Sequence, residues 1–329
     1  MLMNNDIKNE RHVVLITDDN YVMPTAVTIK SIEVNALSEC QYIIHICSFG
    51  LSKDNIDYLN SMSTENFKIV IHIIQEDHYR EKFGLISQKT HVTPSALIKF
   101  DLCKILDGLE RVLYIDSDII VNNSLNELFK YDIENYYLAA SFEFWRYIIA
   151  KKEGTDGLSD FYFNSGVMLF NLKKIREDNI SDILWSVKIN KFNGQDNKSG
   201  LMDQDCFNDV CASMCYQLPI KFNFNPVFSK GNKIQDINKV YNLNYSSIQE
   251  LLDDVVIIHY VGKTDKPWKY ETANYVDLWE KYYLLAGYRI DDLKREVIKK
   301  NIAYYFERFR ISLKKRGLIN TLKYYFSKG

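Results

Sequence analysis

The sequence predicts an α/β fold with a mixed, mostly parallel central sheet that has helices on both faces. Short apolar runs alternate with helical stretches as far as residue 115, which is typical of strand–helix–strand units. Polar residues follow the apolar runs directly, as they do at the carboxyl ends of buried parallel strands. The chain has 329 residues, 47% of them hydrophobic and 26% charged, which indicates a globular protein.

The elements expected up to residue 115 alternate in type. Pro24 stands in the first turn of one expected helix, and Ser52 is the expected N-cap of the next. The expected strands cover residues 12–17, 42–47, 67–74 and 111–115, and the expected helices cover 24–37, 52–61 and 93–106.

The second half of the chain is more mixed. A strand containing Gly166, two helices and a late buried strand are expected there, at residues 162–171, 172–188, 203–211 and 255–260. Residues 291–316 are expected to form a last helix, because their apolar side chains recur at helical spacing. The expected division is therefore a body of residues 1–290 and a basic, aromatic helical tail of residues 291–329.

Charge is distributed unevenly along the chain. Residues 294–329 contain eleven Lys or Arg and two Glu, a net charge of +9, which leaves −11 on the remainder. An acidic body excludes a general nucleic-acid binder, whose basic residues would line its groove. A basic, aromatic tail fits the surface of an anionic membrane, and packing of the same helix on the body is an equally good interpretation.

Composition also predicts the compartment. No apolar run approaches the roughly 20 residues of a membrane span, and residues 1–11 are polar and lack the apolar core of a signal peptide. The six cysteines form no Cys-x-x-Cys pair and are expected to be reduced thiols. We therefore expect a cytoplasmic protein, with a peripheral position at the inner face of the membrane as the further hypothesis.

Several common sites are absent from the sequence. It contains no Gly-x-Gly, no G-x-x-x-x-G-K-[ST], no H-E-x-x-H and no G-x-S-x-G. These absences argue against a dinucleotide-binding fold, a P-loop nucleotidase, a zinc peptidase and an α/β-hydrolase.

Acidic residues follow the expected strand of residues 111–115. Asp116 and Asp118 are two residues apart, so in extended chain both carboxylates face the same way and can bind a divalent cation. His259, in the late strand, adds an imidazole and shifts the preference from Mg²⁺ toward Mn²⁺. A solvated turn is the simpler interpretation of an isolated Asp-x-Asp, because aspartate is common in turns.

Five motifs in order resemble glycosyltransferase family 8, which includes bacterial lipopolysaccharide and lipooligosaccharide galactosyl- and glucosyltransferases and glycogenin. They are DDNY at 18–21, LYIDSD at 113–118, FNSGVMLFNL at 163–172, DQD at 203–205 and H-x-x-G followed by KPW at 259–268. The resemblance implies a GT-A fold for residues 1–290 and a retaining, Mn²⁺-dependent reaction, with Mg²⁺ as the other candidate ion. It also implies a UDP-hexose donor, galactose or glucose, and a saccharide or glycoconjugate acceptor in cell-surface glycan synthesis.

The resemblance assigns roles motif by motif. The implied metal ligands are Asp116, Asp118 and His259. The implied nucleotide contacts are Thr17, Asp18, Asn20, Tyr21, Lys99 and Ser117. The implied contacts to the donor sugar and diphosphate are Asn164, Ser165, Gly262, Lys263 and Lys266. Asp203 and Gln204 match the catalytic residues beside the donor hexose, and His91 and Glu143 match acceptor contacts.

The sequence departs from the family pattern at two places. Lys99 stands where the family usually has Arg, which keeps the charge but loses the planar fork. Three residues, instead of the usual two, separate Gly262 from Lys266, so the loop is expected to bulge, with Lys263 as a rival phosphate contact.

The mechanism implied by these residues is attack by the acceptor on the face from which UDP leaves. Gln204 is an amide and a poor nucleophile, so a covalent intermediate on Gln204 is disfavoured and one on Asp203 is the minority hypothesis. Two other functions compete: a sugar nucleotidyltransferase, disfavoured because residues 18–21 contain no Gly, and a non-catalytic peripheral protein that binds UDP-sugar.

Overall fold

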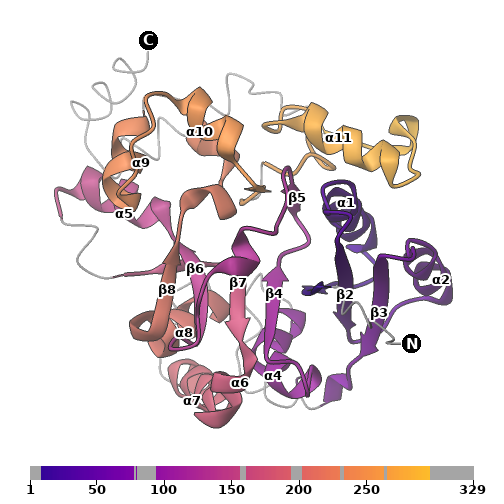
Figure 1. Cartoon of the computed structure of the whole chain (residues 1–329), viewed down its shortest axis with the longest axis horizontal. Helices are drawn as coiled ribbons and strands as arrows, with labels where there is room; N and C mark the ends of the chain where they lie inside the picture. The colour runs from indigo at the N-terminus through magenta and orange to yellow at the C-terminus, as the bar shows by residue number, and fades with distance from the viewer. Residues whose placement is uncertain are drawn as a thin grey trace, which may run out of the picture.

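A seven-stranded sheet forms the centre of the computed structural model, which describes residues 9–77, 79, 94–155, 161–193, 202–229, 233–262 and 265–296 (Figure 1). The strand order is β3-β2-β1-β4-β7-β6-β8. In chain order the strands are β1 (Asn9–Ile16), β2 (Cys40–Ser48), β3 (Phe67–Ile73), β4 (Arg111–Ile115), β6 (Leu138–Phe142), β7 (Phe163–Asn171) and β8 (Cys215–Leu218). Only β7 runs antiparallel to its neighbours β4 and β6, so the predicted mixed, mostly parallel sheet is confirmed.

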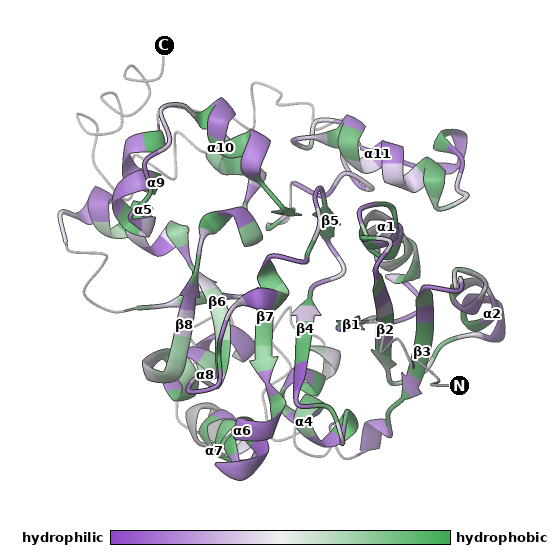
Figure 2. Cartoon of the chain, in the orientation of Figure 1, coloured by the Kyte–Doolittle hydropathy of each residue, from purple (hydrophilic) through white to green (hydrophobic). Residues whose placement is uncertain are grey.

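Alternating side chains of the strands enter two apolar clusters, one on each face of the sheet. Val13 and Leu15 pack on the face covered by α1 (Val22–Val34) and α2 (Lys53–Ser61). Val14, between them, packs on the opposite face. That face is covered by the 3₁₀ helix η1 (Pro94–Asp101), α4 (Leu102–Ile105), α6 (Leu172–Glu177), α7 (Ile180–Asn193) and α8 (Met202–Cys211). Coloured by hydropathy, the central strands are mostly green, as strands buried on both faces should be (Figure 2).

A small second sheet determines where the site forms. It pairs β5 (Ile119–Val121) with β9 (Ile257–His259) in antiparallel register, with Ile119 opposite His259. Because β5 begins directly after Asp118, this pairing brings the late histidine to the Asp-x-Asp segment. A third apolar cluster, with aromatic side chains such as Trp268 and Trp279, supports the second sheet. Its helices are α5 (Phe144–Glu153), α9 (Ile234–Tyr241), α10 (Ile248–Asp254) and α11 (Val276–Leu285), in the upper part of Figure 1.

Three expected helices differ from what the structure shows: those at 172–188 and 93–106, and the one expected from residue 291. The helix expected at 172–188 is two helices, because Asn179 adopts a left-handed conformation with φ of 54° between α6 and α7. The helix expected at 93–106 begins as the 3₁₀ helix η1 and becomes α-helical only at Leu102. By contrast, Ser52 caps α2 as predicted, accepting a hydrogen bond from the Asn55 backbone N–H.

The helix expected from residue 291 does not begin there. One 3₁₀ turn covers Ile290–Asp292, and the chain then runs extended, with a bridge between Tyr270 and Glu296. The Arg295 guanidinium contacts Glu280 and lies 5.8 Å from the ring centroid of Trp279, which holds this stretch against α11. Residues 297–329 lie outside the described part, so the tail and its membrane contact stay predictions.

Two further expectations concern the membrane and the thiols. Among the described residues, no helix combines the length and the apolar composition that crossing a bilayer would require. All six cysteines are free thiols, as expected, and burial raises the pKa of Cys47 and Cys211 to about 12, which makes them unreactive.

Candidate active site

A cleft of about 680 Å³ opens where the carboxyl ends of β1 and β4 meet the second sheet. This edge is where ligands of open α/β sheets bind. The predicted site residues that line it are Thr17, Asp18, Tyr21, Lys99, Asp116, Ser117, Asp118, Glu143, Asn164, Ser165, Asp203, Gln204, His259 and Gly262. Segments separated by more than two hundred residues in the sequence therefore contribute to one cavity.

Two predicted site residues lie outside the cleft lining, and two others are not among the described residues. Asn20 is exposed and outside the cleft lining, and its backbone N–H donates to Asp18 Oδ1 at 2.9 Å. Lys266 is also outside the lining, and its ammonium contacts Asp118 and donates to the Tyr260 carbonyl at 2.6 Å. His91 and Lys263 lie outside the described residues.

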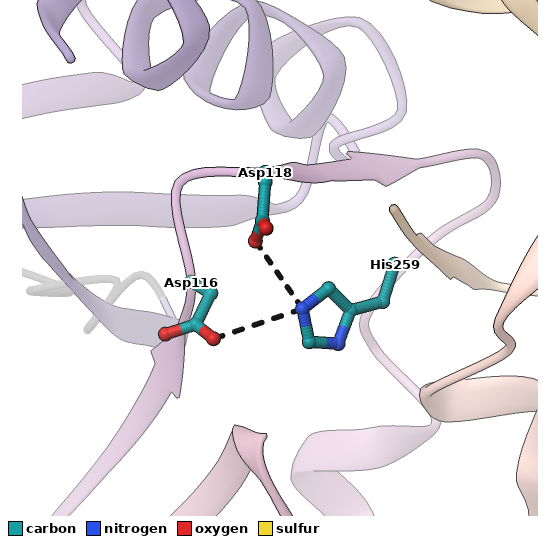
Figure 3. Close-up of side chains that lie close together, drawn as sticks. All are labelled: Asp116, Asp118 and His259. Carbon is teal, nitrogen blue, oxygen red and sulfur yellow. Dashed lines mark ion pairs between the residues drawn. The ribbon is translucent and has the colours of Figure 1, made fainter. Parts of the chain in front are cut away.

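The two aspartates and the histidine converge in the cleft. The ligand atoms of Asp116, Asp118 and His259 all lie within 4.8 Å of one another. His259 Nε2 is 3.2 Å from Asp118 Oδ1 and 3.6 Å from Asp116 Oδ2, and Figure 3 shows both carboxylates directed toward this nitrogen. Two carboxylate oxygens and one imidazole nitrogen form a donor set suited to a divalent transition-metal ion such as Mn²⁺.

Two observations show that these residues fit a cation. Asp118 Oδ1 is buried and accepts no hydrogen bond from the part of the chain that the structure describes, so it has a free acceptor directed at the cluster. A Cβ added to Gly166 would lie 2.2 Å from His259 Cε1 and 2.8 Å from Asp116 Oδ2, so the absence of a side chain there makes room for both ligands. Burial alone would raise the pKa of Asp118, but Lys266 and His259 outweigh it and hold that pKa well below its usual range. Asp118 is therefore ionised and ready to bind a metal.

Lys99 connects the cluster of two aspartates and one histidine to Asp203. Its buried ammonium lies 2.8 Å from Asp203 Oδ2 and 3.3 Å from Asp116 Oδ1. Burial would lower the pKa of Lys99, yet the two carboxylates raise it well above its ordinary value, so the ammonium stays charged. Lys99, which the resemblance assigns to the nucleotide, thus forms ion pairs with two carboxylates of the site.

Gln204 and Asp203 lie at the amino end of α8, beside β7. The Gln204 side-chain oxygen accepts the Ser165 backbone N–H at 3.1 Å, while its buried Nε2 has no hydrogen-bond partner among the described residues. Asp203 Oδ2 accepts from the Ser165 hydroxyl at 3.2 Å as well as from Lys99. Asn208, one turn further on, bonds both backbone groups of Phe163 and so fixes α8 to the strand.

The loop after β1 is a compact turn. Asp18 Oδ1 accepts the backbone N–H groups of Asn20 and Tyr21 at 2.9 and 3.1 Å, as aspartates do in Asx turns. The Tyr21 ring meets Trp268 edge to face at a centroid distance of 5.8 Å. Burial, then Asp118 and Asp116, raise the pKa of Tyr21, so its hydroxyl keeps its proton and can donate.

Several cleft residues were not predicted. Tyr114 donates its hydroxyl to Asp116 Oδ1, and Asn223 contacts His259 Nδ1 at 2.9 Å. Trp145 and the half-exposed Arg146 line the cleft from α5, where the Arg146 guanidinium lies 3.7 Å from the ring centroid of Tyr162. Tyr114 had a signal, since it lies two residues before Asp116 on one strand face. Asn223 had none, because its position depends on a bridge between distant segments.

The strand order and the cleft place the protein in the GT-A fold class of glycosyltransferases. Two solved structures share this fold. One is an apo bifunctional glycosyltransferase, WbbM, with a TM-score of 0.66 and 22% identity over 85% of this chain and 50% of that one. The other is the galactosyltransferase LgtC with donor and acceptor sugar analogues, with a TM-score of 0.63 and 23% identity over 84% of this chain and 95% of that one.

Sequence comparison identifies the family. The profile described as glycosyl transferase family 8 matches residues 12–272, so the chain belongs to that family. A lipopolysaccharide 1,2-glucosyltransferase of Escherichia coli is 27% identical over 328 residues, which cover 95% of this chain and 89% of the relative. The resemblance seen in the sequence is thereby confirmed, and the protein is a glycosyltransferase.

Proposed function

We propose that this glycosyltransferase transfers galactose or glucose from a UDP-hexose to a saccharide acceptor, with retention of configuration and with Mn²⁺ bound by Asp116, Asp118 and His259. The observation that carries the proposal is the convergence of these three ligands within 4.8 Å in a cleft that also contains the Lys99–Asp203 pair. A metal site beside a fixed carboxylate is the arrangement that a diphosphate-linked sugar requires.

The leaving group determines what the metal end of the cleft must do. When bound, the cation would stabilise the negative charge that develops on the departing UDP. Lys266, whose ammonium reaches Asp118 in this structure, supplies a second positive charge next to the diphosphate position. Asp18 and Tyr21, which line the cleft beyond the metal ligands, are the proposed nucleotide contacts.

The donor hexose is proposed to lie against Asp203, Gln204 and Asn164. With Oδ2 of Asp203 engaged by Lys99 and Ser165, its Oδ1 is left to accept a sugar hydroxyl. The free Nε2 of Gln204 is a donor for another hydroxyl. Because a hydrogen bond holds Gln204 Oε1 and an amide is a poor nucleophile, a glycosyl bond to Gln204 is disfavoured, which supports attack by the acceptor on the face that UDP leaves.

The acceptor is proposed to enter along α5. Glu143, Trp145 and Arg146 line that wall, and Ile149 exposes 51% of its surface there. A flat aromatic and an exposed apolar side chain suit the less polar face of a sugar ring. A lipopolysaccharide-type glycan is the proposed acceptor class, by similarity to the Escherichia coli relative.

Contact of residues 294–329 with an anionic membrane is a separate proposal that depends on the sequence alone. Co-sedimentation with anionic vesicles, compared between the full chain and a chain that ends at Ile290, tests it. Equal sedimentation of both chains would contradict it.

A panel of nucleotide sugars tests the proposed reaction. We expect UDP release from UDP-galactose or UDP-glucose with Mn²⁺, slow with water alone and faster with an acceptor glycan. No release from any UDP-sugar, or binding without turnover, would favour the non-catalytic alternative. Formation of UDP-sugar from UTP and sugar phosphate would favour a nucleotidyltransferase.

A further inference from the structure

We propose that Asn223 is a positioning residue that fixes the proton of His259 on Nδ1 and thereby directs the lone pair of Nε2 to the metal. This inference rests on the proposed metal site. The observation is a chain of hydrogen bonds, partly buried at Glu143 and buried at His259, that runs from Glu143 through Asn164 and Asn223 to the imidazole.

The direction of the chain is set at Asn164. The Gly166 backbone N–H lies 2.9 Å from Asn164 Oδ1, and a backbone N–H can only donate, so an oxygen must face it. The other end of the same amide is then Nδ2, which donates to Glu143 Oε2 at 2.7 Å. The carboxylate can only accept and the backbone N–H can only donate. Together they determine which end of the Asn164 amide is the oxygen and which is the nitrogen.

The orientation of Asn164 determines that of Asn223. Asn223 Nδ2 lies 2.9 Å from Asn164 Oδ1 and must be the donor, because Oδ1 is an acceptor. Asn223 Oδ1 then faces His259 Nδ1 at 2.9 Å and accepts its N–H. With the Nδ1 proton engaged, Nε2 is the nitrogen left to face Asp116 and Asp118, whether or not a second proton is present in the metal-free protein.

The fold places Asn223 beside the metal ligand through a short parallel bridge. The Phe224 backbone N–H donates to the Ile257 carbonyl and the His259 N–H donates to the Phe224 carbonyl, each at 2.9 Å. Asn223 is 9% exposed and His259 4% exposed, so water does not compete strongly for these bonds. Gly166 lies against the His259 ring, where there is no room for a Cβ. Partners of this kind around a metal-bound histidine orient the ring and raise its affinity for the metal.

Two variants of Asn223 and a matched control test the proposal. Asn223→Ala removes the acceptor for Nδ1–H, whereas Asn223→Asp keeps an acceptor there but cannot donate to Asn164. Asn225→Ala is the control, because Asn225 is a buried asparagine of the same segment whose side-chain oxygen accepts only from the Val227 backbone N–H among the described contacts.

The first readout is the tautomer of His259 in the metal-free protein, at a pH high enough for the imidazole to be neutral, measured by ¹⁵N NMR of histidine-labelled chain with His259→Gln for assignment. We expect the Nδ1-protonated form in the wild type, in Asn223→Asp and in Asn225→Ala, and a mixture of tautomers in Asn223→Ala. The Nε2-protonated form in the wild type would overturn the proposal.

The second readout is the affinity for Mn²⁺ alone, measured by electron paramagnetic resonance. We expect Asn223→Ala to bind about 10–100-fold more weakly, as other partners of metal-bound histidines do, Asn223→Asp to lie between Ala and wild type, and Asn225→Ala to match the wild type. Unchanged affinity in a folded Asn223→Ala would overturn the proposal. Neither readout uses a nucleotide sugar, so a failure here is distinguishable from a failure of the proposed transfer reaction.

Discussion

Lys99 donates to Asp203 Oδ2 at 2.8 Å and so connects the helix that follows the third strand with the helix that carries the proposed donor-sugar contacts. The Lys99 side chain is 5% exposed and that of Asp203 14%, so each charge depends on the other for compensation. Asp116, at 3.3 Å from the same ammonium, connects the pair to the proposed metal ligands.

Removal of one charge from the Lys99–Asp203 pair should lower the free energy of unfolding. We expect Lys99→Met to lower the free energy of unfolding by about 3 kcal/mol, because two partly buried carboxylates lose a buried counter-ion. Urea unfolding of Lys99→Met, Asp203→Asn and the double variant measures the coupling. The double variant should be less destabilised than the sum of the single variants, and strict additivity would show that the pair is not coupled.

Gly166 is expected to tolerate no side chain. In Gly166→Ala the new Cβ would overlap His259 Cε1 and Asp116 Oδ2, which must move apart. We predict at least about tenfold weaker Mn²⁺ binding, with a stability loss of about 1–3 kcal/mol from overpacking. Gly50→Ala is the matched control, because a Cβ at Gly50 meets nothing within 4 Å. Equal Mn²⁺ affinity in the two variants would contradict the placement of the metal at Asp116 and His259.

Lys266 contacts Asp118, a proposed metal ligand, and this contact predicts two opposite effects. Lys266→Met should bind Mn²⁺ more tightly in the absence of nucleotide, because Asp118 no longer has a competing cation. The same variant should bind UDP more weakly in the presence of saturating Mn²⁺, because a positive charge beside the diphosphate is lost. Calorimetric titration measures both, with the exposed Lys269→Met as control. Weaker binding of both ligands would indicate that Lys266 supports the fold and does not compete with the metal.

Three histidines on β1, β2 and β3 predict a dependence of stability on pH. His45 lies between His12 and His72, at 3.0 and 2.9 Å, and burial, His72 and His12 lower the pKa of His45 from 6.5 to about 3. Between these two values the unfolded chain takes up a proton that the folded chain does not, so stability falls as the pH drops below about 6.5. Its contribution is at most about 1.4 kcal/mol per pH unit.

Urea unfolding at several pH values between 7 and 5 checks this prediction. We expect His45→Leu to lose stability less steeply on acidification than the wild type, since the difference between the two chains isolates this group from the carboxylates. A steeper loss in the variant, or none in either chain, would contradict the depressed pKa of His45.

The sequence was sufficient for much of the fold and for the shared face of Asp116 and Asp118. Strand–helix alternation is a local pattern, and Asp116 and Asp118 share a face because their spacing matches extended chain. The helix expected at 172–188 was wrong in its continuity, because a left-handed Asn179 leaves no periodic signal. Side-chain contacts across distant segments were also beyond prediction, as with Asn223, whose place beside His259 depends on one parallel bridge.

The contacts of Lys99 are another feature of the site that the sequence alone does not determine. A family resemblance assigned it to the nucleotide, whereas in the structure its ammonium is engaged by Asp203 and Asp116. A lysine has a single charged group at the end of a flexible chain, so its partner depends on tertiary geometry that no local pattern records.

The most direct test of the account is a titration of UDP into the protein in the presence of Mn²⁺ and again in excess EDTA, for the wild type and for Asp118→Asn. If a cation on Asp116, Asp118 and His259 holds the diphosphate, the wild type binds UDP tightly only with Mn²⁺, and Asp118→Asn binds it weakly under both conditions. Equal affinity of the wild type for UDP with and without the metal, or tight Mn²⁺-dependent binding by Asp118→Asn, would contradict the account.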